Sequence, residues 1–214
     1  MTKPDILHSM LRPGVIAILR ADHSAGLMEA MEALADGGIT AAEVTFTTPG
    51  ALDLITEAAA RFSGRLCIGA GTVLDAETCR TAILAGAEYI ITPVVRLEVI
   101  RMAARYNKPV ACGAFTPTEC LAAHEAGADF IKLFPAELAG PSGIKSILAP
   151  LPMLQIIPTG GVTPDTAAAF LKAGCVALGA GGSLLSREIL ENRDWAALRA
   201  RAETFVTAVQ NARK

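Results

Sequence analysis

Long apolar runs are missing from this 214-residue chain. No apolar stretch reaches the about 18 consecutive residues that a membrane-spanning helix needs. The first ten residues include Lys3, Asp5 and His8, and they contain no apolar segment of the kind found in a signal peptide. We therefore expect a cytoplasmic protein with no membrane partner.

Charge of one sign is not concentrated anywhere in the sequence. The formal net charge is −2, and neither arginine nor lysine forms a block. A protein that binds nucleic acid or an anionic membrane carries a basic patch on its surface. The charge pattern therefore predicts no nucleic-acid partner, and it leaves a small molecule as the expected ligand.

Cysteine and histidine are too scattered to predict a disulfide framework or a metal site. The cysteines are odd in number and include no Cys-x-x-Cys pair, and the histidines show no spacing typical of metal ligands. We expect buried, reduced thiols, no metal and no cofactor. The residues concerned are Cys67, Cys79, Cys112, Cys120, Cys175, His8, His23 and His124.

Apolar residues, by contrast, make up 52% of the chain, which is enough for a large core. Short apolar runs alternate with helical patterns along the whole length, as in strand–helix–strand units on a parallel sheet. A doubly wound sheet shares many of these signals, but eight units in about 200 residues favour closure into a barrel. We predict a single-domain (β/α)8 TIM barrel over residues 1–214, with a closing amphipathic helix from Asp194 to Lys214. The predicted strands are Val15–Leu19, Ala41–Thr45, Leu66–Gly69, Tyr89–Thr92, Pro109–Cys112, Phe130–Leu133, Gln155–Pro158 and Ala177–Leu178.

Start and stop signals lie between the predicted strands. Thr48-Pro49, Thr116-Pro117 and Thr163-Pro164 each predict a threonine N-cap followed by proline in the first helical turn. Glycines near the opposite helix ends predict positions with positive φ. These glycines are Gly37 and Gly38, Gly86, Gly127 and Gly174.

One lysine stands inside an apolar strand. In the run from Asp129 to Pro135, alternation places Lys132 on the same face as Phe130 and Phe134. Burial disfavours the ammonium form of a lysine, and the neutral amine is a nucleophile toward carbonyl carbon. The alternative is a side chain that extends to solvent with its ammonium in water.

A carboxylate is predicted to share the barrel interior with this lysine. Alternation along the second strand turns Glu43, Thr45 and Thr47 inward. An inward carboxylate is costly unless it is paired or used in catalysis. Glu43 therefore predicts either a structural ion pair with Lys132 or a general acid/base beside it.

Polar and glycine-rich residues gather where each strand ends, which is the active face of this fold. Arg20 follows the first strand, Thr72 the third, and Pro93 the fourth. After the last two strands come Thr159-Gly160-Gly161 and Gly181-Gly182-Ser183, with Ser183 at an expected helix start. Loops at these two positions commonly hold phosphate through backbone N–H groups, although glycine also serves tight turns.

Five motifs, in order along the chain, carry a resemblance to a known family. They are Glu43-Val44-Thr45, Gly69-Ala70-Gly71-Thr72-Val73, Lys132-Leu133-Phe134-Pro135, Pro158-Thr159-Gly160-Gly161 and Gly181-Gly182-Ser183. Together they resemble the 2-keto-3-deoxy-6-phosphogluconate / 4-hydroxy-2-oxoglutarate aldolase family of class I lyases. The resemblance extends from about Pro13 to Ser183.

The resemblance implies a homotrimeric barrel that cleaves a 2-keto-3-deoxy sugar acid phosphate into pyruvate and glyceraldehyde 3-phosphate. It implies that Lys132 forms a Schiff base and that Glu43 is the acid/base. Substrate-binding roles are implied for Thr72, Pro93, Phe134 and Thr159, and phosphate binding for Gly160, Gly161, Gly182 and Ser183.

One position departs from the family pattern. Many members have a substrate-binding arginine where this chain has Thr47. Arg20 is the expected substitute, because a guanidinium offers two parallel hydrogen bonds to a carboxylate.

Other functions stay open at this point. The substrate can be the gluconate epimer, the galactonate epimer or unphosphorylated 4-hydroxy-2-oxoglutarate. A sugar-phosphate isomerase or epimerase would use Glu43 as its base and the same phosphate loops. A non-catalytic barrel that binds a phosphorylated metabolite is a third alternative.

Overall fold

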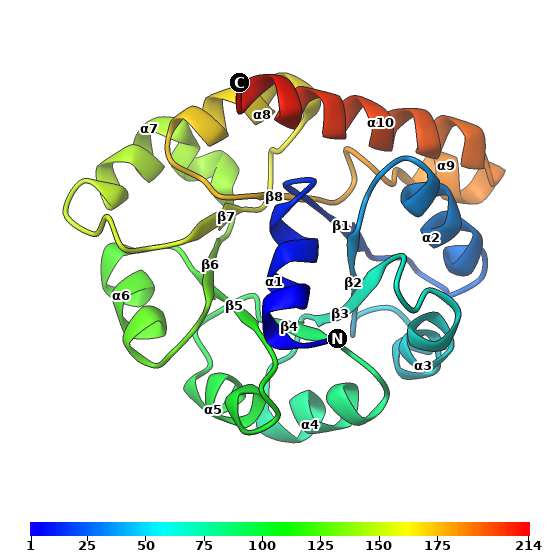
Figure 1. Ribbon diagram of the computed structural model, residues 1–214, viewed down its shortest axis with the longest axis horizontal. Coiled ribbons are helices and arrows are strands. Elements are labelled where there is room, and N and C mark those ends of the chain that lie inside the picture. The colour runs from blue at the N-terminus through cyan, green and yellow to red at the C-terminus, as the bar shows by residue number, and fades with distance from the viewer.

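The computed structural model describes residues 1–214 and shows parallel strands alternating with helices around a ring (Figure 1). Eight strands form one sheet in the order β7-β6-β5-β4-β3-β2-β1-β8, and each strand is parallel to its neighbours. A bridge between Thr159 and Gly179 joins β7 to β8 and closes the ring. The predicted (β/α)8 barrel is confirmed.

The elements follow one another with short connections. The strands are β1 (Val15–Leu19), β2 (Ala41–Thr45), β3 (Cys67–Gly71), β4 (Tyr89–Ile91), β5 (Val110–Ala114), β6 (Phe130–Leu133), β7 (Ile156–Pro158) and β8 (Leu178–Ala180). The helices are α1 (Lys3–Leu11), α2 (Leu27–Asp36), α3 (Ala51–Arg61), α4 (Ala76–Leu84), α5 (Leu97–Arg105), α6 (Pro117–Glu125), α7 (Ala136–Leu148), α8 (Pro164–Lys172), α9 (Arg187–Asn192) and α10 (Trp195–Ala212).

Three strands extend further toward their carboxyl ends than predicted, and each extension includes a glycine. β3 reaches Gly71, β5 includes Gly113, and β8 includes Gly179. A β-carbon at these positions would overlap a neighbour inside the barrel. Glycine usually weakens a strand. At these three strand positions a larger residue would not fit, because there is no space for a side chain.

Two of the three predicted helix starts are confirmed. Thr116 and Thr163 cap α6 and α8, each in a reciprocal capping box with the third helical residue. The prediction for Thr48 is wrong, because α3 begins at Ala51 after Gly50. Thr48 is instead buried, and its hydroxyl accepts a hydrogen bond from the Ala21 N–H at 3.2 Å.

A glycine with positive φ ends each of the four predicted helices, but the prediction is wrong for Gly37, which caps α2 with a φ of −81°. Gly38, Gly86, Gly127 and Gly174 have φ values of +88°, +109°, +98° and +106°. These left-handed conformations suit glycine because it has no β-carbon. Each helix can therefore turn directly into the following strand.

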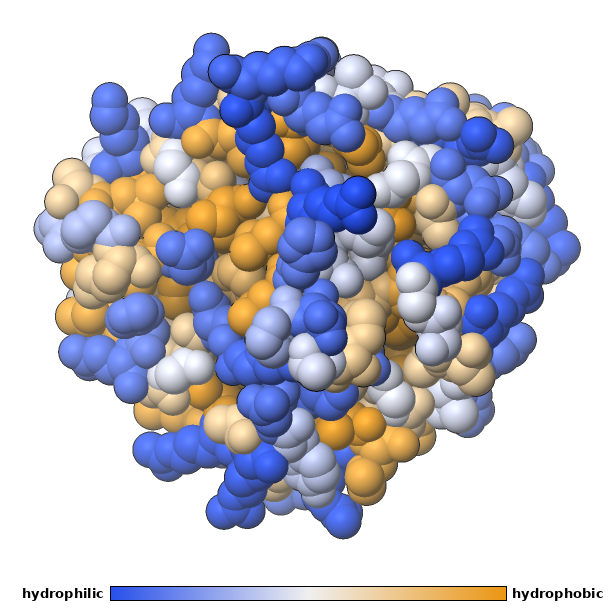
Figure 2. Space-filling view, in the orientation of Figure 1, coloured by the Kyte–Doolittle hydropathy of each residue, from blue (hydrophilic) through white to orange (hydrophobic).

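The amino end of the barrel is filled and closed. α1, which the sequence analysis did not predict, lies across it (Figure 1) and buries Ile6 and Met10 completely. These side chains pack on an interior layer that includes Tyr89 and Phe130. Figure 2 shows this face with hydrophilic side chains along α1 and hydrophobic surface on both sides of it. Because this end is packed, open space in the barrel is confined to the carboxyl ends of the strands.

The predicted closing helix is confirmed as α10. It begins at Trp195, where the Asp194 side chain accepts a hydrogen bond from the Ala197 N–H at 3.0 Å. α10 lies along α8 and α2 on the outside of the barrel (Figure 1). Its buried face includes Leu198 and Phe205. α10 therefore holds α2, from the first part of the chain, and α8, from its last part, on the same side of the barrel.

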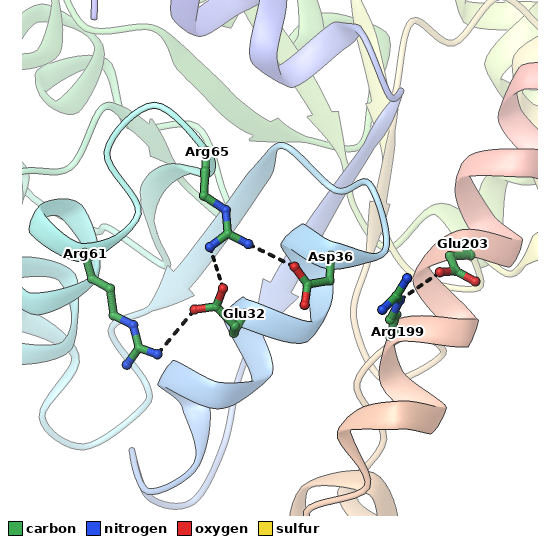
Figure 3. A network of polar contacts seen from close by, with 6 residues as sticks. All are labelled: Glu32, Asp36, Arg61, Arg65, Arg199 and Glu203. Carbon is green, nitrogen blue, oxygen red and sulfur yellow. Dashed lines mark hydrogen bonds and ion pairs between the residues drawn. The ribbon is translucent and has the colours of Figure 1, made fainter.

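Ion pairs on the helical surface connect α2 with α3 (Figure 3). Arg65 contacts both Glu32 and Asp36, and Arg61 contacts Glu32 at 3.3 Å. The hydrogen bond from Arg65 is the main reason that the pKa of Glu32 lies below its usual value. Exposed ion pairs add little to stability because water and salt screen them, so the fold depends chiefly on its core. No helix combines the length and apolar character needed to cross a membrane.

Candidate active site

A cavity of about 540 Å³ opens at the carboxyl ends of the strands. Its volume is in the range of small-molecule sites, which is about 300–1,000 Å³. Residues from β1, β6 and β8 and from the segments that follow β1, β4, β6, β7 and β8 make up its wall. The predicted site residues on this wall are Arg20, Pro93, Lys132, Phe134, Thr159, Gly160, Gly161, Gly182 and Ser183.

Lys132 and Glu43 meet inside the barrel. The Lys132 Nζ lies 3.4 Å from the Glu43 Oε1, and the two side chains are 7% and 1% exposed. Lys132 therefore does not extend into solvent, and the predicted inward direction of both residues is confirmed. The amine also lies 5.9 Å from the centre of the Phe134 ring. The cavity wall includes Lys132 but not Glu43, so a bound ligand meets the amine and the carboxylate lies behind it.

Glycine on β3 makes space for the carboxylate. Glu43 on β2 pairs with Gly69, and Thr45 pairs with Gly71. A β-carbon at Gly71 would overlap the Glu43 Oε1, so the carboxylate can occupy its place only beside glycine. The repeated glycines of this strand thus have a steric explanation.

A second polar side chain lies below the ion pair. Tyr89 is 0% exposed, and its ring packs directly against Gly69. Burial raises the pKa of its phenol well above the usual value, and nearby Cys67 and Glu43 act in the same direction. Sequence reasoning missed this residue. The sequence signal that could have identified it is a tyrosine at a position of β4 that faces the barrel interior.

The middle of the cavity wall is built from residues that follow four strands. Arg20 is exposed directly after β1, and Phe134 is 36% exposed after β6. Pro93 is seated over Gly113, whose missing β-carbon leaves room for the Pro93 backbone. Thr159 is 8% exposed, and its Oγ1 packs on Gly179. A guanidinium, an aromatic ring and a hydroxyl thus face one space.

The loops after β7 and β8 form the far end of the cavity. Gly160 and Gly161 have φ values of +96° and +67°. The Ser183 hydroxyl donates a hydrogen bond to the Val162 carbonyl at 2.6 Å and joins the two loops. The N–H groups of Gly161, Gly182 and Ser183 donate no hydrogen bond within the chain. Backbone N–H groups in this arrangement suit an anion.

The expected helix start at Ser183 is wrong. Residues 181–185 form a turn, in which the N–H groups of Leu184 and Leu185 donate to the Gly181 carbonyl. α9 begins at Arg187, and Ser186 is its N-cap. Any anion bound here would therefore meet a turn and not the end of a helix.

Two predicted substrate-binding residues are not on the cavity wall. Thr47 is exposed, and its hydroxyl lies 2.9 Å from that of Thr45, which donates to the Leu19 carbonyl. Thr72 follows β3 with a φ of +58°. Positive φ is rare for a β-branched residue, and such strain concentrates at functional sites. Their roles stay predictions.

Charged residues at the cavity mouth were also missed. Asp22 and His23 belong to the loop after β1, and Arg187 and Glu191 belong to α9. Arg187 donates to Glu191 at 2.7 Å, and this bond is the main reason that the pKa of Arg187 lies above its usual value. No motif marks these residues, because their place on the wall depends on how two loops fold.

The fold and the site together define a barrel enzyme in which a lysine amine and a glutamate carboxylate meet at the closed end of a polar cavity. The family model described as "KDPG and KHG aldolase" matches residues 6–201. The chain belongs to this aldolase family, and it is a carbon–carbon lyase.

Individual relatives are similar over most of their length. A 2-dehydro-3-deoxy-6-phosphogalactonate aldolase of Escherichia coli is 36% identical over 171 residues, which cover 79% of this chain and 83% of the relative. A 2-dehydro-3-deoxy-phosphogluconate aldolase of Pseudomonas aeruginosa is 34% identical over 183 residues, 85% of this chain and 83% of the relative. The solved 2-keto-3-deoxy-6-phosphogluconate aldolase of Zymomonas mobilis with 3-phosphoglycerate has a TM-score of 0.83, 27% identity and 96% coverage of each chain.

Proposed function

We propose that this protein is a class I aldolase that cleaves 2-keto-3-deoxy-6-phosphogluconate into pyruvate and glyceraldehyde 3-phosphate through a Schiff base on Lys132. The observation that carries the proposal is the buried contact between Lys132 and Glu43 at the floor of the cavity. Burying two charges is costly, and pairing repays the cost only in part. Once the lysine loses its proton, the amine is a nucleophile, and the neighbouring carboxylate is available for proton transfer.

The reaction begins when the Lys132 ammonium gives its proton to Glu43 or to water, and the neutral amine adds to the C2 ketone; the same proton returns to the carbinolamine oxygen when water leaves. Loss of water from the carbinolamine gives a protonated imine, which withdraws electrons from the C3–C4 bond. Glu43, directly or through a water, accepts the proton of the C4 hydroxyl as that bond breaks and the aldehyde product leaves. The electron pair forms an enamine on the lysine. Protonation at C3 and hydrolysis of the imine release pyruvate and restore the amine.

The far end of the substrate is assigned to the loops after β7 and β8. Unpaired N–H groups of Gly161, Gly182 and Ser183 can donate to a phosphate. The relative from Zymomonas mobilis was solved with a phosphorylated three-carbon acid, which supports this assignment. Binding energy at the phosphate orients the reacting carbon over Lys132.

The substrate carboxylate is assigned to Arg20. This arginine lies on the cavity wall, and its guanidinium can form two parallel hydrogen bonds to a carboxylate. Thr47, at the position where many relatives have an arginine, is held by Thr45 and lies outside the wall. Arg20 therefore supplies the positive charge that an arginine at the position of Thr47 supplies in those relatives.

Pyruvate release, coupled to lactate dehydrogenase, tests the proposal with three substrates. These are the gluconate phosphate, its galactonate epimer and 4-hydroxy-2-oxoglutarate, which would yield pyruvate and glyoxylate. We expect turnover in the wild type, none in Lys132→Ala, and slow cleavage in Glu43→Gln. Lys145→Ala, an exposed lysine on α7, is the matched control and should retain full activity. Turnover that persists in Lys132→Ala would refute the Schiff-base mechanism.

A preference for the galactonate epimer is the second candidate function. The relative named for that substrate is 36% identical, and the relative named for the gluconate is 34% identical. The epimers differ at one hydroxyl, so the same assay decides between them through the ratio of kcat/KM values. A sugar-phosphate isomerase or epimerase on this barrel would release no pyruvate from any of the three.

A homotrimer is the proposed assembly. Large apolar side chains are exposed after four consecutive strands, with Leu74 46%, Val94 51%, Phe115 37% and Leu138 74% exposed. Neighbouring strands place these residues along one side of the barrel rim, and apolar patches of this kind mark protein interfaces. Light scattering should give a mass three times the 22.2 kDa of the chain. A mass equal to that of one chain would contradict the proposal.

A further inference from the structure

Two polar atoms inside the barrel lack a partner. The Tyr89 phenol oxygen is buried and makes no hydrogen bond, and neither does the Glu43 Oε2. The other carboxylate oxygen, Oε1, faces the Lys132 amine. Nearly all buried polar groups in folded proteins are paired. Two unpaired groups in one closed space therefore suggest that they share a contact.

The strand register places these two residues at the same level of the barrel, on either side of β3. Glu43 on β2 and Tyr89 on β4 are both paired with Gly69 on the strand between them. A β-carbon at Gly69 would overlap the outer half of the Tyr89 ring. The ring therefore crosses β3, and its hydroxyl points toward the strand that carries Glu43.

We propose that the Tyr89 hydroxyl and the Glu43 Oε2 are joined through one bridging water, to which the hydroxyl donates and which donates to the carboxylate, and that this contact holds the carboxylate against Lys132. The proposal rests on the aldolase mechanism above, in which Glu43 accepts the C4 hydroxyl proton. Tyr89 is a positioning residue, because it lies below the cavity wall and does not reach the substrate. It keeps its proton throughout the cycle, and its raised pKa is consistent with a constant donor.

The titratable groups around the phenol are few. Glu43 approaches from β2 and Cys67 from β3, and Lys132 from β6 is in contact with Glu43. Cys67 lies with Tyr89 in the same apolar interior cluster. The thiol is thus the competing partner for the phenol, and an experiment has to separate the two.

The test is Tyr89→Phe, which removes only the hydroxyl. We expect kcat for pyruvate release to fall about tenfold with KM changed less than about twofold, because the bridged hydrogen bond to a charged group is lost. The acid limb of the pH–rate profile should move to higher pH, since a donor to a carboxylate favours its ionised form. Trapping of pyruvate on Lys132 by borohydride should proceed at the wild-type rate, which shows that the site is folded.

Two matched variants complete the design. Ile91→Val removes one methylene from the same interior layer, and Cys67→Ala removes the competing thiol. Both should keep the wild-type kcat and pH profile. A wild-type kcat and acid limb in Tyr89→Phe would overturn the proposal, and so would an equal loss of kcat in Cys67→Ala. Failure of Lys132→Ala to abolish turnover would instead refute the aldolase mechanism itself.

A crystal structure of the wild type gives a measurement that does not depend on a variant. The proposal requires one water within about 3.2 Å of both the phenol oxygen and the Glu43 Oε2. A phenol whose nearest polar neighbour is the Cys67 thiol would contradict it.

Discussion

Gly71→Ala is the change that tests most sharply whether packing positions the catalytic carboxylate. A β-carbon at this position would overlap the Glu43 Oε1, and the carboxylate is 1% exposed with the barrel wall around it. The overlap can be relieved only if the carboxylate rotates away from Lys132. The variant therefore adds steric strain and separates a buried ion pair at the same time.

The steric strain sets the expected loss of stability, and the displacement of the carboxylate sets the expected loss of activity. Overpacking of a core costs about 1–3 kcal/mol, and each kcal/mol lowers the Tm of a domain of this size by about 2–4 °C. We expect calorimetry to show a Tm lower by about 2–12 °C. Because Glu43 no longer faces the reacting carbon, kcat should fall at least about tenfold.

A shorter carboxylate should relieve the strain. Gly71→Ala combined with Glu43→Asp should be more stable than the sum of the two single variants predicts, with a coupling of at least about 0.5 kcal/mol. Gly143→Ala in α7, where the nearest atom to an added β-carbon is at 3.1 Å, is the control and should change stability by less than about 1 kcal/mol. A Gly71→Ala protein with wild-type Tm and kcat, or additive effects in the double variant, would refute the steric argument.

Three further predictions concern the loops and a helix cap. Backbone hydrogen bonds from Thr116 are the main reason that the pKa of Glu119 lies below its usual 4.5; this stabilisation is present above pH 4.5 and is lost as the pH falls through the lower folded pKa. Denaturant unfolding should therefore show Glu119→Gln less stable by up to about 1 kcal/mol at pH 7, with a difference that shrinks as the pH falls below 4.5, and a difference that stays constant as the pH falls would contradict this cause. Thr72→Gly should raise stability by up to about 1 kcal/mol, because glycine accepts the positive φ, while KM for the keto acid increases; a loss of stability would show that the strain is absent. Ser183→Ala should increase KM for phosphorylated substrates about tenfold and leave 4-hydroxy-2-oxoglutarate unaffected, because the loops after β7 and β8 lose their connecting hydrogen bond; equal effects on both substrates would place the phosphate elsewhere.

The barrel and its central pair were predictable because both depend on short-range periodicity. Alternation along two strands was enough to turn Lys132 and Glu43 inward, and a charge in an apolar strand is a strong signal. The capping boxes at Thr116 and Thr163 were predictable for the same reason, since a cap involves residues close in sequence.

The remaining features depend on contacts between distant segments. Thr48 resembles a helix cap, but its hydroxyl is used by the loop after β1, so α3 starts later. Ser183 lies in a turn because its hydroxyl is bonded to the loop after β7. Tyr89 becomes a candidate partner of Glu43 only through the strand register, which pairs both residues with Gly69. No local pattern contains this information.

The central claim is that the Lys132 amine forms a covalent bond with a ketone, and mass spectrometry tests it most directly. Protein incubated with pyruvate and reduced with borohydride should gain about 72 Da, the mass of a reduced pyruvyl imine, on the peptide that contains Lys132. The gain should be absent from Lys132→Ala and from protein reduced without pyruvate. An unmodified Lys132 in wild-type protein that turns over substrate, or a label on another lysine, would contradict the account.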